Sequence, residues 1–237
     1  MASKFASRSN EAELMDDLES SGEVIDQTLR ELEVINKWLG GNQVTISGLN
    51  RLVTNAALPI RKLKIVDLGC GGGDMLKLIA RWGRKKKLDI ELIGIDANPN
   101  IVAFAEKNTR EYPEISYKAI NIFSDEFKAL SFDVVTSTLF THHFTNEQLA
   151  ALFGQLRMQA SLGMVINDLH RHWFAYHSIK MLTAAFSRSE MVRNDAAVSV
   201  LRSFHQSEIE SIMKKTSIEN YSIRWMWAFR WQIVCWF

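Results

Sequence analysis

Residues 64–74 of this 237-residue chain have the sequence KIVDLGCGGGD, and this stretch decides the fold. A short apolar run ends at Asp67, a cluster of glycines follows, and a segment with helical spacing begins at Asp74. That order predicts a strand, a tight turn and a helix N-terminus. Because glycine has no Cβ and tolerates positive φ, such a turn lets a ligand approach the backbone.

The spacing of the glycines limits which ligand this turn can take. The dinucleotide fingerprint needs glycine at the first, third and sixth positions. Gly69 and Gly71 fit, but Asp74 stands at the sixth position, where its charge would lie near phosphates. The Gly-Lys-Ser/Thr of a P-loop does not follow either. The turn therefore predicts a ligand that is neutral or cationic at this point.

A second apolar run, LIGID at residues 92–96, also ends in an acid, Asp96. An acid at the end of the second strand of a βαβ unit can accept hydrogen bonds from both hydroxyls of a ribose. The series VDLGCGGGD, GIDANP and FDVVTSTLFTHHF, in this order, resembles the motifs of class I S-adenosylmethionine-dependent methyltransferases over roughly residues 62–168. The resemblance implies an α/β fold with a doubly wound, mostly parallel seven-stranded sheet of Rossmann-like type, whose last strand is antiparallel.

The resemblance also implies S-adenosyl-L-methionine as cofactor, with S-adenosyl-L-homocysteine as its product. By motif position, the cofactor-binding residues lie at the carboxyl ends of the strands: Asp67, Gly69, Cys70, Gly71, Gly73, Asp96, Ala97, Asn121, Ile122, Ser137 and Thr138. Asp67 has a structural alternative, since an acid can also order the glycine turn.

The rest of the chain follows an alternating pattern. Strands are expected at about 64–68, 90–96, 115–120, 132–137 and 164–168, with a terminal pair at 218–225 and 230–237. Helices are expected at 11–18, 24–39, 47–58 and 74–82, after Asn98-Pro99, after Thr145, at 170–186 and after a capping box at 207–210. We therefore expect an N-terminal helical cap at 1–60, disordered over 1–10, and a cofactor-binding domain at 61–237 with a helical insertion at about 170–203. The cap either covers the pocket or only stabilises the sheet.

Histidines near the predicted pocket are candidates for catalysis. Methyl transfer expels a neutral leaving group, so a base is needed only when the acceptor carries a proton, as a phenol with a pKa of ~10 does. Candidate catalytic residues are His142 and His143, after the fourth strand, and the pair Asp168 and His170, at the end of the fifth. His143 matches the histidine of a Glu-His pair in the resembled family, while His142 replaces the glutamate. Alternatively, His143 orders its loop and Asp168 caps a helix, with His170 exposed.

The composition excludes several classes of protein. A net charge of +1 gives no field that favours nucleic acid, and the basic run at 84–87 suits a solvated helix end. With two cysteines, no signal peptide and no transmembrane segment in the sequence, we expect a reduced, cytoplasmic protein, monomeric or homodimeric. The histidine cluster suggests metal ligands, but nothing in the sequence fixes their geometry, so no metal is predicted.

The core resembles the methyltransferases of ubiquinone biosynthesis and of polyketide and phenolic-lipid tailoring. The resemblance implies O-methylation of a phenolic hydroxyl in a secondary-metabolite or quinone-like pathway. The aromatic residues of the insertion, Trp173, Phe174, Tyr176 and Phe186, indicate a small hydrophobic, aromatic or lipid-like acceptor. C-methylation of the same kind of acceptor and a non-catalytic cofactor-binding protein remain as alternatives. Nucleic-acid methylation is disfavoured by STLF at 137–140, and NAD oxidoreduction by Asp74. The alternating aromatics Trp225, Trp227, Phe229 and Trp231 indicate sheet core or, alternatively, a substrate wall.

Overall fold

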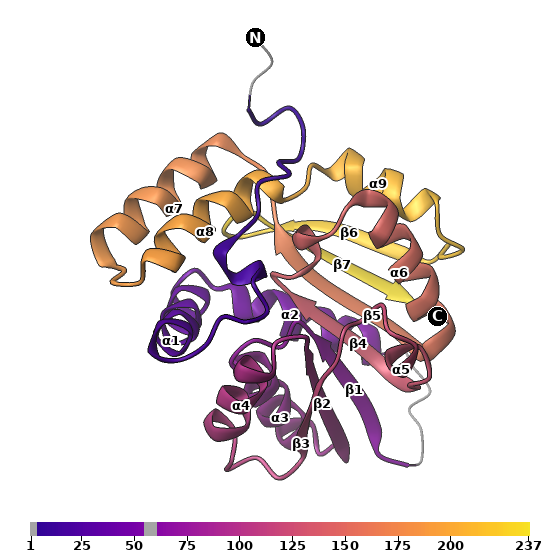
Figure 1. Cartoon of the computed structure of the whole chain (residues 1–237). Helices are drawn as coiled ribbons and strands as arrows, with labels where there is room; N and C mark the ends of the chain where they lie inside the picture. Colours follow the sequence, from indigo (N-terminus) through magenta and orange to yellow (C-terminus); the bar gives the residue numbers. More distant parts are fainter. Residues whose placement is uncertain (1–3, 55–60) are drawn as a thin grey trace.

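The computed structural model describes residues 4–54 and 61–237. Its sheet has the strand order β3-β2-β1-β4-β5-β7-β6 (Figure 1). The strands are β1 (Leu63–Leu68), β2 (Ile90–Asp96), β3 (Ile115–Ala119), β4 (Phe132–Thr138), β5 (Ala160–Leu169), β6 (Tyr221–Met226) and β7 (Arg230–Trp236). Strands β1 to β5 pair in parallel, and β7 is antiparallel to both β5 and β6. The predicted doubly wound, mostly parallel seven-stranded sheet is confirmed.

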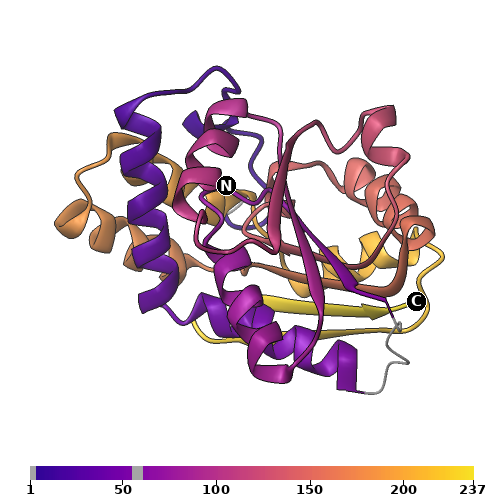
Figure 2. The same ribbon diagram turned by 90° about the horizontal axis from the view of Figure 1, so that it is seen from below.

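Helices cover both faces of this sheet (Figure 2). One apolar cluster joins α6 and α9 to one face, and a second joins α2 and α3 to the other. The helices are α1 (Glu23–Trp38), α2 (Gly41–Thr54), α3 (Asp74–Lys86), α4 (Pro99–Asn108), α5 (Asp125–Lys128), α6 (Asn146–Gln159), α7 (Trp173–Phe186), α8 (Glu190–Arg202) and α9 (Gln206–Lys214), with single 3₁₀ turns η1 (Leu14–Asp16) and η2 (Thr141–His143). Within residues 4–54 and 61–237, no helix has both the length and the apolar character needed to cross a membrane.

Local signals set several helix starts as predicted. The Asn98 side chain accepts a hydrogen bond from the backbone of Asn100, and Pro99 occupies the first helical position of α4. Thr145 and Gln148 form the reciprocal capping box of α6. The box expected at 207–210 is wrong by two residues, because His205 and Glu208 form it and α9 begins at Gln206.

The helical insertion expected at about 170–203 contains two helices. Helix α8 starts at the Ser189 cap and packs against α7. Helix α7 begins at Trp173, and not at His170, which instead forms an isolated bridge with Phe204. Helix α3 continues to Lys86, so most of the basic run belongs to its last turn.

The N-terminal region also differs from expectation. The helix expected at 11–18 is the single turn η1. Arg8, placed in a segment expected to be disordered, donates to Asn146 Oδ1 and to the carbonyls of His142 and Arg202 at 2.7–2.8 Å. The predicted end of the third helix, at residue 58, lies outside the described residues. The last residues of the expected helical cap, up to its boundary with the cofactor-binding domain at 60/61, also lie outside them.

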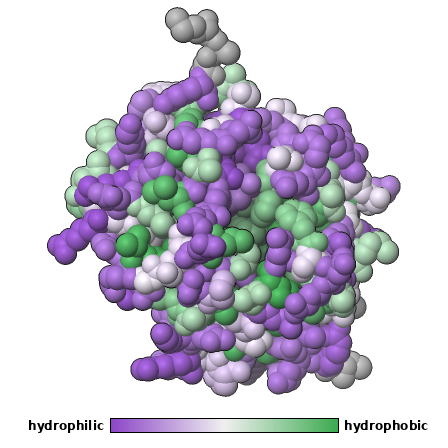
Figure 3. Space-filling model, viewed as in Figure 1, coloured by the Kyte–Doolittle hydropathy of each residue, from purple (hydrophilic) through white to green (hydrophobic). Residues whose placement is uncertain are grey.

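The four alternating aromatics do not form sheet core together. Trp231 on β7 is buried, but Trp225 and Trp227 are 48% and 72% exposed. The turn between β6 and β7 interrupts the alternation, and Phe229 adopts a positive φ of 54° there. The prediction of sheet core is therefore wrong for Trp225 and Trp227. Trp227 and Phe229 instead line the cavity described below, where the alternative of a substrate wall would place them. On the face seen in Figure 1, hydrophobic residues lie among hydrophilic ones (Figure 3).

Candidate active site

A cavity of about 710 Å³ lies at the carboxyl ends of the parallel strands. Its walls come from the glycine turn after β1, the ends of β2, β4 and β5, helices α1, α7 and α8, and the β6–β7 turn. Residues 4–22, which we call the N-terminal strap, also contribute side chains; this segment passes α8 on its way to α1 (Figure 1). Ligands of open α/β sheets bind at this edge, so the cavity is the candidate site.

The glycine turn brings bare backbone to this cavity. Gly71 has a φ of 49°, and a Cβ there would meet nothing nearer than Leu29 at 3.8 Å. At Gly69 a Cβ would lie 2.2 Å from the Phe140 ring, and at Gly73 it would lie 2.3 Å from the Tyr117 hydroxyl. Gly71 therefore lines open space, whereas Gly69 and Gly73 allow close packing behind it.

The two acids at the ends of β1 and β2 both line the cavity. Asp96 accepts hydrogen bonds from the backbone N–H of Gly71 at 3.3 Å and of Asn98 at 3.0 Å. Burial raises the pKa of Asp96 in spite of these hydrogen bonds. Asp67 accepts from Thr136 Oγ1 at 2.7 Å, and burial raises its pKa to about 7. Each oxygen of Asp96 keeps a lone pair that can accept a ligand hydroxyl.

Most of the predicted cofactor residues gather around this cavity. Besides the residues above, Gly69, Cys70, Ala97, Asn121, Ile122 and Thr138 line it. Gly73 and Ser137 do not: Gly73 starts α3, and the buried Ser137 hydroxyl donates to the Leu68 carbonyl at 3.3 Å. Gly73 and Ser137 lie next to the turn but outside the cavity wall. Their predicted contact with the cofactor therefore has no support from the lining of the cavity.

A buried His–Asp pair lies where β4 and β5 end. His142 Nδ1 lies 2.7 Å from Asp168 Oδ1, and Asp168 Oδ2 accepts from Thr141 Oγ1 at 2.5 Å. Burial favours neutral His142, but Asp168 and then Glu13 outweigh it and raise the pKa of His142 to about 10. Burial likewise opposes ionisation of Asp168, yet His142 and Thr141 hold the pKa of Asp168 below its ordinary value.

This pairing differs from the predicted one between Asp168 and His170. Strand β5 ends at Leu169, and His170 turns away from the cavity to accept from Trp225 Nε1 at 3.2 Å. Burial and the nearby His172 and His205 lower the pKa of His170 to about 4. Nor does Asp168 cap α7, since the His172 side chain does so. The structure brings Asp168, His142 and His143 together and leaves His170 outside.

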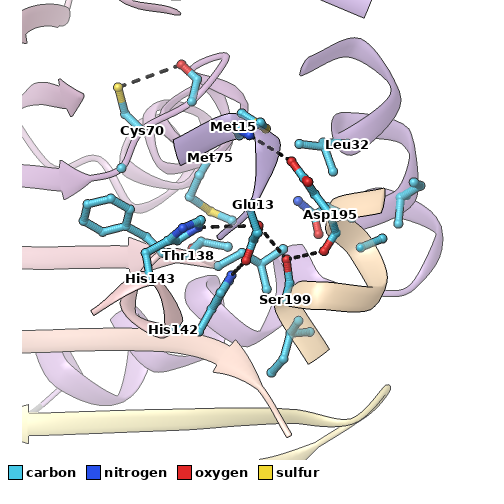
Figure 4. Close-up of a pocket in the computed structure, with 18 of the residues that line it drawn as sticks. Glu13, Met15, Leu32, Cys70, Met75, Thr138, His142, His143, Asp195 and Ser199 are labelled. Atoms are coloured by element: carbon cyan, nitrogen blue, oxygen red, sulfur yellow. Dashed lines mark hydrogen bonds and ion pairs between the residues drawn. The ribbon is translucent and has the colours of Figure 1, made fainter. Parts of the chain in front are cut away.

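Sequence reasoning missed the part of the site that the strap supplies. Glu13 lies between the two histidines, with Oε1 3.4 Å from His142 Nε2 and Oε2 3.9 Å from His143 Nε2 (Figure 4). Ser199 donates to Glu13 Oε2 at 2.8 Å, and Asp16 Oδ1 lies 2.6 Å from His143 Nδ1. No local pattern marks these acids, because their partners lie far away in the chain.

Three of these residues have the donor atoms to hold a metal ion. One oxygen of Glu13 and one ring nitrogen each of His142 and His143 lie within 4.8 Å of one another. A carboxylate and two imidazoles suit a zinc-like ion. The same atoms also suit a protonated His142 between two carboxylates, so the predicted absence of a metal stays a prediction.

Comparison with known proteins identifies the core of the chain. Residues 65–163 match the family described as "Methyltransferase domain". This chain contains a class I methyltransferase domain. The ubiquinone biosynthesis O-methyltransferase of Bartonella quintana is 28% identical over 122 residues, which are 50% of this chain and 46% of that protein. The corresponding enzyme of Agrobacterium fabrum is 27% identical over 92 residues. The chain thus spans less than half the length of the curated relatives it matches.

Solved structures place the methyltransferase domain in the same fold. The plantazolicin methyltransferase in complex with S-adenosylhomocysteine superimposes with a TM-score of 0.58 at 22% identity, covering 85% of this chain and 73% of that one. Human N-acetylserotonin methyltransferase gives a TM-score of 0.61 at 11% identity, covering 90% and 55%. The family predicted from the three sequence motifs is confirmed.

Proposed function

We propose that this protein is an S-adenosylmethionine-dependent methyltransferase that O-methylates a phenolic hydroxyl of a small, hydrophobic, aromatic acceptor. The methyltransferase domain and the relatives named as O-methyltransferases support the reaction class. The largely apolar cavity wall, which includes Leu32, Ile179 and Leu182, supports a hydrophobic acceptor.

The residues of the glycine turn fit the cofactor. A side chain at Gly71 would project into the cavity, so glycine leaves the backbone open to the amino-acid end of the ligand. Asp96 has free lone pairs for ribose hydroxyls, and Ile122 offers an apolar surface for a base. When bound, the cofactor supplies a sulfonium methyl group; the protein's task is to align the acceptor with it and to exclude water.

One observation carries the proposal of a phenolic acceptor. His142 Nε2 has no hydrogen-bond partner in the described part of the chain, while Nδ1 is held by Asp168 at 2.7 Å. His142 is protonated near neutral pH while Asp168 and Glu13 both raise its pKa. Displacing Glu13 removes one of these two carboxylates, and Asp168 on Nδ1 then orients the ring so that a neutral Nε2 can accept the proton of the acceptor. An acceptor hydroxyl reaches Nε2 only if the strap shifts, because Glu13 Oε1 lies 3.4 Å away. The acceptor and Glu13 therefore compete for this position.

C-methylation of an activated phenol ring needs the same proton acceptor, so the position of the transferred methyl must be measured. The test is incubation with S-adenosylmethionine and a panel of phenols, with product release followed by mass spectrometry and methyl position by NMR. We expect His142→Asn to lower turnover by about 10²–10⁴-fold, as loss of a general base does. His143→Asn and His170→Asn test the other predicted histidines.

A matched control is His177→Asn, because His177 is exposed on α7 and does not line the cavity. It should retain full turnover. A wild-type rate in the His142→Asn variant at every pH would refute the base assignment, and a product methylated on carbon would refute O-methylation.

A further inference from the structure

Arg230 is a buried cation that lines the cavity and has no ion-pair partner within the part of the chain that the structure describes. It begins β7 and is 2% exposed. Nη2 donates to Asn36 Oδ1 at 2.9 Å and Nη1 to Asn167 Oδ1 at 3.4 Å, both neutral amides. Nε has no hydrogen-bond partner among residues 4–54 and 61–237. Several of the five N–H donors of the guanidinium are thus unused.

The other buried arginines of the fold are paired. Arg171 lies 2.8 Å from a carboxylate oxygen of Glu208, and Arg202 lies 2.5 Å from one of Asp16. A buried charge is costly unless a counter-charge and hydrogen bonds satisfy it. Burial lowers the pKa of Arg230 to about 10, with Asp168 acting in the opposite sense, so the side chain is still a cation near neutral pH. Asp168 itself is hydrogen-bonded to His142, and no ion pair joins it to Arg230 in the described part of the chain.

The strand order separates Arg230 from the glycine turn. The turn follows β1, and β4 and β5 lie between β1 and β7. At about 4.8 Å between neighbouring strands, three steps separate Arg230 from the turn by about 14 Å. Arg230 pairs instead with Leu169, the residue after Asp168, and the cavity wall beside it includes Leu39 and Phe229. It therefore lies on the acceptor side of the cavity.

We infer that Arg230 binds a carboxylate of the methyl acceptor, which makes the substrate an aromatic acid. The planar guanidinium fork matches a carboxylate, and the apolar wall around it strengthens a charge-assisted hydrogen bond. The inference rests on the proposed function, since it names the acceptor class of that same site. The cofactor's own carboxylate is the competing source of an anion.

Asn36→Asp tests this assignment without removing the arginine. The substitution keeps the side-chain shape and puts a carboxylate oxygen where Asn36 Oδ1 lies, 2.9 Å from Nη2. The new carboxylate of residue 36 then neutralises the charge of Arg230. The arginine stays in place, so we expect the fold to be retained while the ligand carboxylate loses its partner. Asn42→Asp is the matched control, because Asn42 also lines the cavity while the side-chain hydrogen bonds of Arg230 go to Asn36 and Asn167.

The experiment is calorimetric titration, with and without S-adenosylhomocysteine, of benzoate, 4-hydroxybenzoate, 3,4-dihydroxybenzoate and their methyl esters. We expect at least one acid to bind about 10- to 100-fold more tightly than its ester, as for a hydrogen bond to a charged group. Asn36→Asp should abolish that preference, and Asn42→Asp should keep it.

Three results would overturn the inference. The first is that every ester binds as well as its acid, and the second is that Asn36→Asp keeps the preference for the acid. The third is that Asn36→Asp weakens binding of S-adenosylhomocysteine instead, which would assign Arg230 to the cofactor. A failure of the proposed function can be told apart from a failure of this inference, because wild type would then not bind S-adenosylhomocysteine.

Discussion

Replacing Asp168 by Asn should separate the catalytic role of the His–Asp pair from its structural role. The Asp168 carboxylate accepts from Thr141 Oγ1, His142 Nδ1 and the backbone N–H groups of His142 and Leu169, at 2.5–3.0 Å. Breaking a buried charged pair costs about 3–5 kcal/mol. Because the amide oxygen of Asn still accepts some of these bonds, we expect the lower end, about 3 kcal/mol.

The effect on turnover should be larger than this loss of stability suggests. The amide removes the charge and lets the His142 ring adopt the other tautomer, so we expect turnover to fall by about 10²–10⁴-fold. The affinity for S-adenosylhomocysteine should be nearly unchanged, because Asp168 does not line the cavity. Steady-state product release below the melting transition gives the rate, and urea unfolding gives the free energy.

Asp133→Asn is the matched control for this prediction. Asp133 is also a buried carboxylate, near the amino end of β4, where it binds Arg61 at 2.7 Å and the backbone N–H of Lys64 at 2.9 Å. Its loss should lower stability without lowering turnover at a temperature where the variant is folded. If Asp168→Asn kept turnover within about threefold of wild type, the pair would have no catalytic part.

Three further predictions concern the buried Asp67, two glycines and the possible metal ligands. Burial raises the pKa of Asp67 from its ordinary 3.8 to about 7, so the folded state holds this proton more tightly than the unfolded state. Wild type should therefore lose about 1.4 kcal/mol per pH unit relative to Asp67→Asn as pH rises from about 4 to 7; a flat difference in urea unfolding between the two would contradict this. Gly69→Ala should destabilise by several kcal/mol because its Cβ would lie 2.2 Å from the Phe140 ring, whereas Gly154→Ala, with open space in α6, should stabilise by about 0.5–1 kcal/mol. Exhaustive treatment with a chelator should leave methyl transfer unchanged; a loss of activity restored by zinc would show that the imidazoles beside the strap hold an ion.

The sheet and two of the helix caps were predictable because their signals are local. Buried apolar runs mark the strands, and the Asn98-Pro99 and Thr145–Gln148 patterns mark helix starts within four residues. The cofactor side of the site follows from the same pattern, since parallel strands bring their carboxyl ends to one edge. A fold of this kind therefore places Asp67 and Asp96 beside one cavity from sequence alone.

The acceptor side was not predictable, because it depends on contacts between distant segments. Asp168 seemed to belong with His170, two residues away, but the parallel pairing of β4 with β5 brings the loop containing His142 to it. Glu13 meets His142 only after the strap folds over the sheet. Such contacts leave no periodicity in the sequence, and the buried Arg230 carries no motif at all.

The central claim is that the glycine turn and Asp96 bind an S-adenosyl ligand. Calorimetric titration with S-adenosylhomocysteine tests it most directly, with Asp96→Ala as the perturbation and Asp89→Ala, an exposed acid before the other end of β2, as the control. We expect micromolar binding by wild type and the control, loss of binding in Asp96→Ala, and no binding of NADH. Absence of binding by wild type, or equal binding of NADH, would contradict the account.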